Sequence, residues 1–389
     1  MANSIDFAPV WAELRGQPEA VEQLAAAVRN KDAGVHHAWL FTGPPGSGRS
    51  NLAHAFAAAL LCPDGGCSTC KSCVMAAAGT HPDIEILATE RVQISIQEVR
   101  DIVANSYLGG SMGSYRILII EDADRMQDHA SNVLLKSLEE PPANTIWMLC
   151  APSEADMLQT IRSRVRRVGL KVPAVNDVAA LLVERDGIDL ATAQRAAAEA
   201  QSHVGMARRL ATSADARNRR QDTLRLALAI DTVTSAVLAA ERWLDIAKKD
   251  ADALTKERDL EEHEQLLRTM GLAPGDTIPP GLRTAFKNLE ESQKRRAQRS
   301  LRDGIDRIMV DLLALYRDVL MVQLDSNSPL VNEFLKPQIE ASARASTAAA
   351  TIDKLDAIAQ ARVRIDSNVR DLLALEALAV QLRQGVKRK

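Results

Sequence analysis

A glycine-rich octapeptide, GPPGSGRS at residues 43–50, limits the possible folds of this chain more than any other feature. It follows the apolar run AWLFT and precedes a stretch rich in alanine and leucine. A strand, a tight turn and a helix in this order surround a phosphate with backbone N–H groups. Gly43, Gly48 and Ser50 fit the phosphate-loop pattern, but Arg49 stands where that pattern has lysine. The sequence therefore predicts a phosphate-binding turn in which arginine replaces the usual lysine.

Short apolar runs alternate with helical patterns over the first 170 residues. Strands are expected at 38–42, 83–87, 116–121, 145–150 and 165–170, and helices at 17–30, 49–61, 96–107, 128–139 and 155–161. This alternation predicts a parallel sheet covered by helices on both faces. Strand patterns stop near residue 174. Three short helices are expected at 174–213, and the rest of the chain is expected to be helical except for the loop-like break at 271–281.

Composition sets broader limits on the chain. Its 389 residues predict two or three domains. Aromatic residues make up only 3%, which favours helices packed through alanine and leucine over a β-sandwich. The formal net charge of −3 provides no general attraction for nucleic acid. A stretch of eighteen apolar residues and a signal-peptide pattern are both missing, so a cytoplasmic location and no membrane partner are expected.

Four of the five cysteines lie within twelve residues, and the group consists of Cys62, Cys67, Cys70 and Cys73. In a reducing compartment this spacing favours a structural Zn²⁺ held by four thiolates over free thiols, a redox pair or an iron–sulfur cluster. Four thiolates complete the coordination, so nearby His81 is interpreted as a turn residue before Pro82. Cys150, in the apolar run TIWMLC, is predicted to lie in the core.

Two further motifs bear on phosphate chemistry. The apolar run RILII leads into Glu121 and Asp122, a position typical of a carboxylate that holds Mg²⁺. The segment TIRSRVRR carries four arginines, at positions 162, 164, 166 and 167. Taken alone, this segment is either a solvated basic loop or a source of an arginine that reaches the γ-phosphate of a neighbouring subunit.

These motifs occur in one order together with VWAELRGQPEAVEQL (10–24), GTHPD (79–83) and LLKSLEEPP (134–142). The chain resembles the bacterial DNA polymerase III clamp-loader family of the AAA+ ATPases, strongly over residues 7–210. The resemblance implies an α/β AAA+ core at 1–172 with an inserted zinc module at 62–73. An all-α lid domain at 173–215 and an all-α collar domain at 216–389, with a charged insertion near 248–281, are expected to follow.

The chain departs from the ATPase subunits of this family at several positions. Arg49 replaces the phosphate-loop lysine, Glu121-Asp122 stands for Asp-Glu, and Ala151-Pro152 stands where a sensor threonine is expected. Ser163-Arg164 keeps the first two residues of the serine–arginine–cysteine motif. The combination implies a ring subunit with a degenerate pocket of its own and an arginine finger, Arg164, for the adjacent subunit.

The resemblance also implies a set of residues for the degenerate nucleotide site. These residues are Gly43, Gly46, Gly48, Arg49, Ser50, Asp122 and Arg208, with Arg208 at the second sensor position. Arg208 is alternatively a surface residue of the lid. ATP or ADP can still bind such a loop, with Mg²⁺ only when a nucleotide is bound.

The implied partners are the γ/τ and δ subunits of a five-membered ring, the sliding clamp (β) and primed DNA reached through the ring. One alternative is a γ/τ-type ATPase with an atypical phosphate loop. Another is a different AAA+ protein, such as a helicase loader or an unfoldase, although LLKSLEEPP and the inserted cysteines argue against it. ATP turnover by the isolated chain separates the first alternative from a non-catalytic ring subunit.

Overall fold

The computed structural model describes residues 8–31, 34–270, 272–273, 279, 282–367 and 369–383. The chain divides into two compact units, the first made of Met1–Thr89 with Gln93–Thr212 and the second of Ser213–Lys389 with Glu90–Val92. The border falls directly before helix α10 (Ala214–Leu228), whose first turn is capped by the side chain of Ser213. It lies three residues before the border that the sequence suggested between lid and collar.

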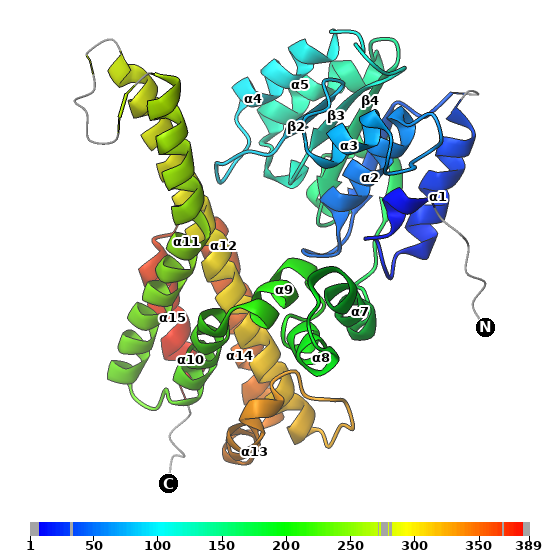
Figure 1. The fold of residues 1–389 in the computed structure, drawn as a ribbon. Helices are drawn as coiled ribbons and strands as arrows, with labels where there is room; N and C mark the ends of the chain where they lie inside the picture. Colours follow the sequence, from blue (N-terminus) through cyan, green and yellow to red (C-terminus); the bar gives the residue numbers. More distant parts are fainter. Residues whose placement is uncertain are drawn as a thin grey trace. The chain divides into compact units, whose positions relative to one another are not determined.

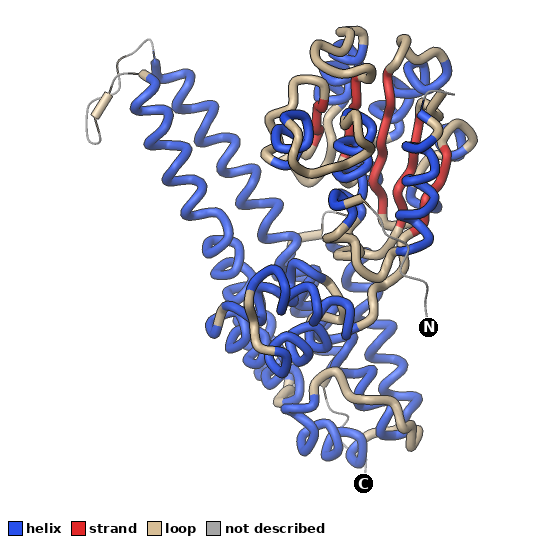
Figure 2. The backbone as a smooth tube through the Cα atoms, turned by 45° about the vertical axis from the view of Figure 1, so that its right-hand side comes forward, coloured by secondary structure: helices blue, strands red, loops and turns tan. Residues whose placement is uncertain are grey.

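The first unit contains a parallel five-stranded sheet with strand order β2-β3-β4-β1-β5 (Figures 1 and 2). The strands are β1 (Ala38–Thr42), β2 (Ile84–Leu87), β3 (Arg116–Ile120), β4 (Thr145–Ala151) and β5 (Arg166–Gly169). The central strands β3, β4 and β1 are almost entirely buried, as expected of a parallel sheet with two covered faces.

Alternate residues of each strand enter two separate cores. Trp39 and Phe41 of β1 pack with α1 (Pro18–Arg29) and α2 (Arg49–Leu61), whereas Leu40 packs with α4 (Ile96–Ser106) and α5 (Asp128–Glu139). The two-residue period of a strand places successive side chains on opposite faces. The predicted α/β core, a parallel sheet with helices on both faces, is therefore confirmed.

Two local predictions need correction. The helix expected at 155–161 is instead a 3-10 turn, Glu154–Asp156, followed by the short helix α6 (Gln159–Arg162). The backbone of Met157 is extended (ψ 144°), and this interrupts the helix. Helix α3 (Lys71–Ala77), which the sequence did not predict, follows the N-cap residue Cys70, whose sulfur accepts the backbone N–H of Cys73. Seven residues are too few for a clear helical period.

Three helices, α7 (Val175–Asp186), α8 (Leu190–Glu199) and α9 (Val204–Thr212), follow the sheet in the same unit. Gly187 ends α7 in the left-handed conformation (φ 66°), where the lack of a side chain avoids strain. The contact faces are built from alanines, and Ala193, Ala196, Ala197 and Ala200 are all buried. The expectation of alanine-packed helices holds here.

A buried carboxylate fixes the loop that leads into β3. Asp83 is 1% exposed and accepts the backbone N–H groups of Ser111, Met112 and Gly113 as well as the Ser111 hydroxyl. Burial by itself raises the pKa of the Asp83 carboxyl, but the three N–H donors outweigh burial and hold this pKa below its usual range. The GTHPD motif thus ends in a residue that anchors a loop almost thirty positions away.

We expect Asp83→Asn to lower the free energy of unfolding by about 1–3 kcal/mol, because it removes the charge from a buried hydrogen-bonded carboxylate. Since the folded-state pKa of Asp83 is depressed, its stabilisation is complete above about pH 4 and is lost as pH falls further. Urea unfolding at pH 7 and pH 3 measures both effects. Asp101→Asn, an exposed change on α4, is the control, and equal stability of the two variants at pH 7 would contradict the prediction.

In the described residues of the second unit, all regular secondary structure is helical. The unit contains α10, α11 (Val233–Thr269), α12 (Arg283–Gln323), α13 (Lys336–Ala345), α14 (Ala348–Asp366) and α15 (Asp371–Leu382). Trp243 and Tyr316 are fully buried in its core, where Leu312, Leu315 and Val319 also lie. The apolar side chains of α12 around Leu315 are therefore covered by other helices of the same unit.

The charged stretch 248–268 forms the second half of α11, which runs beside the first half of α12 (Figure 1). Arg296 of α12 pairs with Asp259 and Glu262 of α11, and Gln293 donates to the Asp259 carbonyl. This region is a helical hairpin held by ion pairs rather than a loop. Most of the predicted break at 271–281 lies outside the described residues.

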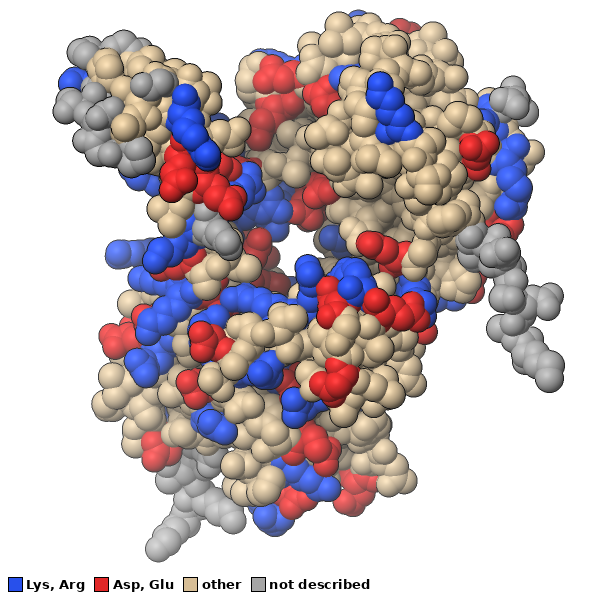
Figure 3. Space-filling view, viewed as in Figure 1, with Lys and Arg blue, Asp and Glu red and all other residues tan. Residues whose placement is uncertain are grey.

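The distribution of surface charge agrees with the small net charge of the chain. On the face shown in Figure 3, basic and acidic side chains are interspersed over the second unit, without a large area of one sign. Within the described part of the chain, no helix is both long enough and apolar enough to span a membrane.

Candidate functional site

The phosphate-loop segment has the geometry of a strand–turn–helix junction. β1 ends at Thr42, and α2 begins at Arg49 after Gly48, which is left-handed (φ 94°). A Cβ atom on Gly43 would lie 2.8 Å from the Ser47 hydroxyl and 2.9 Å from Leu170, so a side chain does not fit there. The turn therefore depends on its glycines, as the motif requires.

Arg49 is turned back into this loop. Its Nη1 donates a hydrogen bond to the Gly43 carbonyl, and its Nη2 lies 3.7 Å from Asp122 Oδ1. The side chain is only 11% exposed. The guanidinium thus bridges the Gly43 carbonyl, at the start of the loop, and the Asp122 carboxylate, which the sequence predicts to hold Mg²⁺. Both the carbonyl and the carboxylate are therefore already paired with the Arg49 cation.

The acidic residues after β3 have partners as well. Glu121 Oε1 lies 3.2 Å from His54 Nε2 of α2, and Asp122 Oδ2 lies 3.7 Å from Arg125 Nε. Burial, followed by the nearby Asp122 charge, raises the pKa of the Asp124 carboxyl. The structure therefore brings Arg49 and Asp122 together, and it adds His54 and Arg125, which the motif did not indicate.

The lid contacts the loop through His203 rather than through Arg208. A Cβ atom on Gly46 would lie 2.2 Å from the His203 ring, so this imidazole rests directly on the loop backbone. Arg208 is 59% exposed, and its Nε lies 3.0 Å from Asp186 Oδ1 of the same lid. A single histidine before α9 carries no motif, and sequence reasoning had no signal for its role.

The N-terminal segment joins the loop to the rest of the sheet. Gln17 donates to the carbonyls of Lys171 (2.7 Å) and Ser47 (3.3 Å) and accepts the N–H of Lys171. Trp11 is 4% exposed and belongs to the core under this sheet face. Both residues fix the position of the loop by packing and hydrogen bonding.

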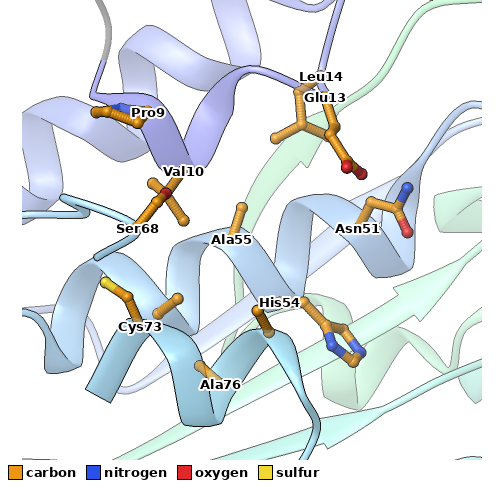
Figure 4. Close-up of a pocket in the computed structure, with 12 residues that line it drawn as sticks. Pro9, Val10, Glu13, Leu14, Asn51, His54, Ala55, Ser68, Cys73 and Ala76 are labelled. Atoms are coloured by element: carbon orange, nitrogen blue, oxygen red, sulfur yellow. The ribbon is translucent and has the colours of Figure 1, made fainter. Parts of the chain in front are cut away.

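A cavity of about 360 Å³ opens beside the loop helix (Figure 4). It is bounded by the 3-10 helix η1 (Pro9–Trp11), α2 and α3. Ser68 and Cys73 lie toward one end of the cavity, and Glu13 and Asn51 lie toward the other. The cavity therefore connects the edge of the phosphate loop with the cysteine module.

The four arginines of TIRSRVRR have separate environments. Arg162 and Arg167 both contact Glu154, and the guanidinium of Arg166 lies 5.2 Å from the centre of a Trp39 ring. Arg164 has other partners. Its Nη1 donates to the Thr160 carbonyl (2.6 Å) and to Ser163 Oγ (3.0 Å), and its Nη2 lies 2.5 Å from Glu139 Oε1. The segment is thus not a uniform basic loop, because Arg164 contacts Glu139, Thr160 and Ser163, whereas the other three arginines contact Glu154 or Trp39.

The cysteine group is arranged as a metal site. The four sulfurs all lie within 4.8 Å of one another, with Cys62–Cys67 at 3.6 Å and Cys62–Cys70 at 3.8 Å. A tetrahedral Zn²⁺ with Zn–S bonds of about 2.3 Å separates its sulfurs by about 3.8 Å. Gly65 and Gly66 are left-handed and turn the chain between the first two ligands. The cluster can therefore hold a metal ion.

Hydrogen bonds to sulfur prepare the thiols for such an ion. The backbone N–H groups of Cys67, Cys70 and Cys73 point at the sulfurs of Cys62, Cys67 and Cys70. The Thr69 hydroxyl, with nearby backbone N–H groups, lowers the pKa of Cys67 to about 6. Burial raises the pKa of the Cys73 thiol. Donors to sulfur stabilise the thiolate form, which is the form that binds metal.

His81 has a larger role than the turn position that the sequence suggested. It is 3% exposed, its Nε2 lies 2.9 Å from the Ser72 hydroxyl of α3, and its Nδ1 accepts the Asp83 N–H. Burial lowers the pKa of the His81 imidazole. The neutral ring thus connects the cysteine module to the start of β2.

Sequence comparisons relate the chain to subunits of DNA polymerase III. The family described as "DNA polymerase III, delta subunit" matches residues 16–174. The chain is 38% identical over 143 residues to DNA polymerase III subunit delta′ of Pseudomonas aeruginosa, covering 35% of this chain and 44% of that protein. It is 25% identical to the delta′ subunit of Bacillus subtilis over 96% of this chain and 99% of that protein.

A gamma/tau subunit and a solved structure are also similar to the chain. A DNA polymerase III subunit gamma/tau of Mycobacterium bovis is 29% identical over 46% of this chain and 32% of that protein. A solved DNA polymerase III gamma-subunit-related protein of Thermotoga maritima covers 93% of this chain and 98% of its own, with 16% identity and a TM-score of 0.40.

The delta′ relatives thus differ in how far the match extends. The matched stretch spans less than half of the Pseudomonas protein, whereas it spans almost the whole of the Bacillus protein. The phosphate-loop turn, the acidic strand end and LLKSLEEPP all lie within the residues matched by the family. The chain is thus similar to delta′ subunits of DNA polymerase III, and its residues 16–174 match the family described as "DNA polymerase III, delta subunit".

Proposed function

We propose that this chain completes a clamp-loader ring as a largely non-catalytic stator and lends Arg164 to the ATP site of the neighbouring motor subunit. The ring, made with γ/τ and δ subunits, places the β sliding clamp on primed DNA in the cytoplasm. The proposal rests on the different environments of two arginines, Arg49 and Arg164. Arg49 is engaged within its own phosphate loop, whereas the side chain of Arg164 is 34% exposed at the end of α6.

The nucleotide site of the chain itself supports this division of roles. A phosphate that enters the loop has to displace the Arg49 guanidinium from the Gly43 carbonyl and the His203 ring from Gly46. The motor subunits use a slim lysine at this position, which contacts phosphate as a point charge, whereas a guanidinium is wide and planar. ATP or ADP can bind here only at the expense of these internal contacts, and Mg²⁺ would then meet Asp122.

Arg164 suits the role in trans for a chemical reason. Phosphoryl transfer spreads negative charge over the γ-phosphate oxygens, and an inserted guanidinium stabilises that charge. The other three arginines of the segment contact Glu154 or Trp39 of their own unit. Arg164 also contacts its own unit through Glu139, so what favours it as the finger is the Ser163-Arg164 motif and its position after a short helix.

We also propose that the cysteine module holds a structural Zn²⁺. The sulfur separations and the N–H donors to sulfur fit this ion. Four thiolates fill a tetrahedral shell, so the ion lacks a position for substrate and serves the fold. Cys62 ends α2 and Cys70 begins α3, so the metal fixes the angle between these two helices.

ATP binding and turnover by the isolated chain test the stator role. We expect negligible hydrolysis and weak nucleotide binding by the wild type. Arg49→Lys should tighten ATP binding by about tenfold, the value of one charge-assisted hydrogen bond, because a lysine in this loop points at phosphate. Hydrolysis should stay negligible, since Ala151 and Pro152 still stand where the motors have a sensor threonine.

The control is Arg29→Lys, a change of the same kind in an exposed ion pair at the end of α1. It should leave nucleotide binding as in the wild type. If the wild-type chain already hydrolyses ATP at the rate of a motor subunit, the stator role is wrong and the γ/τ-type ATPase takes its place.

A further inference from the structure

The guanidinium of Arg164 is held from two sides. On one side its Nη1 donates to the Thr160 carbonyl and to Ser163 Oγ, both within the turn that Arg164 follows. On the other side its Nη2 lies 2.5 Å from Glu139 Oε1. A guanidinium has five N–H donors, and these contacts account for three of them. The Nε–H and the second Nη2 hydrogen are left over from these contacts.

Glu139 comes from a different part of the fold. It is the last residue of α5, twenty-five positions before Arg164, and its side chain is 48% exposed. A carboxylate at the carboxyl end of a helix faces the negative end of the helix dipole, which is locally unfavourable. The helix itself therefore provides no reason for an acidic residue at this position. The contact with Arg164 provides one, because a guanidinium stabilises the charge.

We propose that Glu139 is the positioning residue of the arginine finger. It holds one edge of the Arg164 guanidinium so that the remaining donors are presented in a fixed direction to the γ-phosphate of the neighbouring subunit. This inference rests on the proposed role of Arg164 in trans.

The physical basis is preorganisation. A free arginine at the end of a short helix samples many rotamers, and each of them has to be given up when the finger engages. A displacement of about 1 Å in a group that contacts the reacting atoms can reduce a rate about a hundredfold. Exposed ion pairs contribute little to folding stability, so a change at Glu139 should alter the direction of the finger and leave the fold intact.

The experiment uses the complete ring, assembled so that only the motor subunit beside this chain keeps its phosphate-loop lysine. ATP hydrolysis stimulated by clamp and primed DNA then reports a single site. Glu139→Gln should lower the maximal rate about tenfold with the ATP concentration at half-maximal rate unchanged, since positioning acts in the transition state. Glu140→Gln removes the same charge one residue along and should leave the rate unchanged.

A double-mutant cycle separates positioning from a structural role. In the Arg164→Ala background, Glu139→Gln should cause no additional loss, because its effect passes through the arginine. An equal loss in both backgrounds would overturn the proposal, as would a wild-type or faster rate for Glu139→Gln in a ring that Arg164→Ala slows. If Arg164→Ala itself leaves the rate unchanged, the proposed function fails rather than the role of Glu139 alone. Equal melting temperatures of the Glu139→Gln and Glu140→Gln chains confirm that both variants fold.

Discussion

Arg164→Ala is expected to abolish nearly all ATP hydrolysis at the motor site beside this chain and to leave the chain folded and assembled. An arginine inserted at the γ-phosphate is worth about 10³–10⁵ in rate. The loss should be confined to the motor site beside this chain, so clamp loading should fall more than total ATP consumption. The side chain is about one third exposed, and surface substitutions of this kind change stability little.

Arg164→Lys should fail almost as completely, because an ammonium lacks the planar fork and cannot keep the contacts of both amino groups at once. Arg167→Ala is the matched control, with the same loss of charge three residues along at a side chain that is 57% exposed. Steady-state ATPase and clamp-loading assays on the assembled ring measure the effect. Equal activities of the Arg164→Ala and Arg167→Ala rings would show that Arg164 does not act as an arginine finger.

Loss of the metal is expected to destabilise the first unit strongly. We expect about one zinc per purified chain, and chelation or Cys67→Ser should release it. Without the ion, three or four thiols are left facing one another, and the turn through Gly65 and Gly66 loses the bond that closes it. A loss of several kcal/mol in a unit of about two hundred residues lowers the melting temperature by roughly 10 °C.

Cys150→Ala provides the control for zinc content. Cys150 lies in β4, fully enclosed in the core, and burial raises the pKa of its thiol, so this cysteine should not take part in metal binding. This variant should keep the full zinc content, whatever it does to core packing. Absence of zinc from the wild type, or unchanged stability after all four cluster cysteines are replaced by serine, would show that the module folds without a bound metal.

Several features of this protein could be predicted from the sequence because their cause is local. The phosphate-loop turn follows from glycine spacing, the strands from apolar runs, and the cysteine module from the distances between ligands along the chain. Helices α2 and α5 begin and end at the predicted residues. In each case the residues that form the feature lie within about a dozen positions of one another along the chain, so their sequence spacing is enough to predict their geometry.

Local causes also explain where these predictions were wrong. The helix expected at 155–161 begins later, because Met157 is extended, and a seven-residue helix such as α3 is too short for a period to appear. The sensor role of Arg208, by contrast, stays a prediction. The structure pairs Arg208 with Asp186, and the sequence between α7 and α9 contains no pattern that could have shown this contact.

Only the tertiary structure decided which distant residues meet. The strand order β2-β3-β4-β1-β5 places Arg49 beside Asp122 and brings the loop of one strand to the acidic end of another. Packing of the lid places His203 on Gly46, and packing of α5 against α6 places Glu139 on Arg164. These contacts join residues that are 25 to about 160 positions apart. Sequence spacing carries no information about such pairs, because their distance depends on how whole elements pack rather than on the period of any one element.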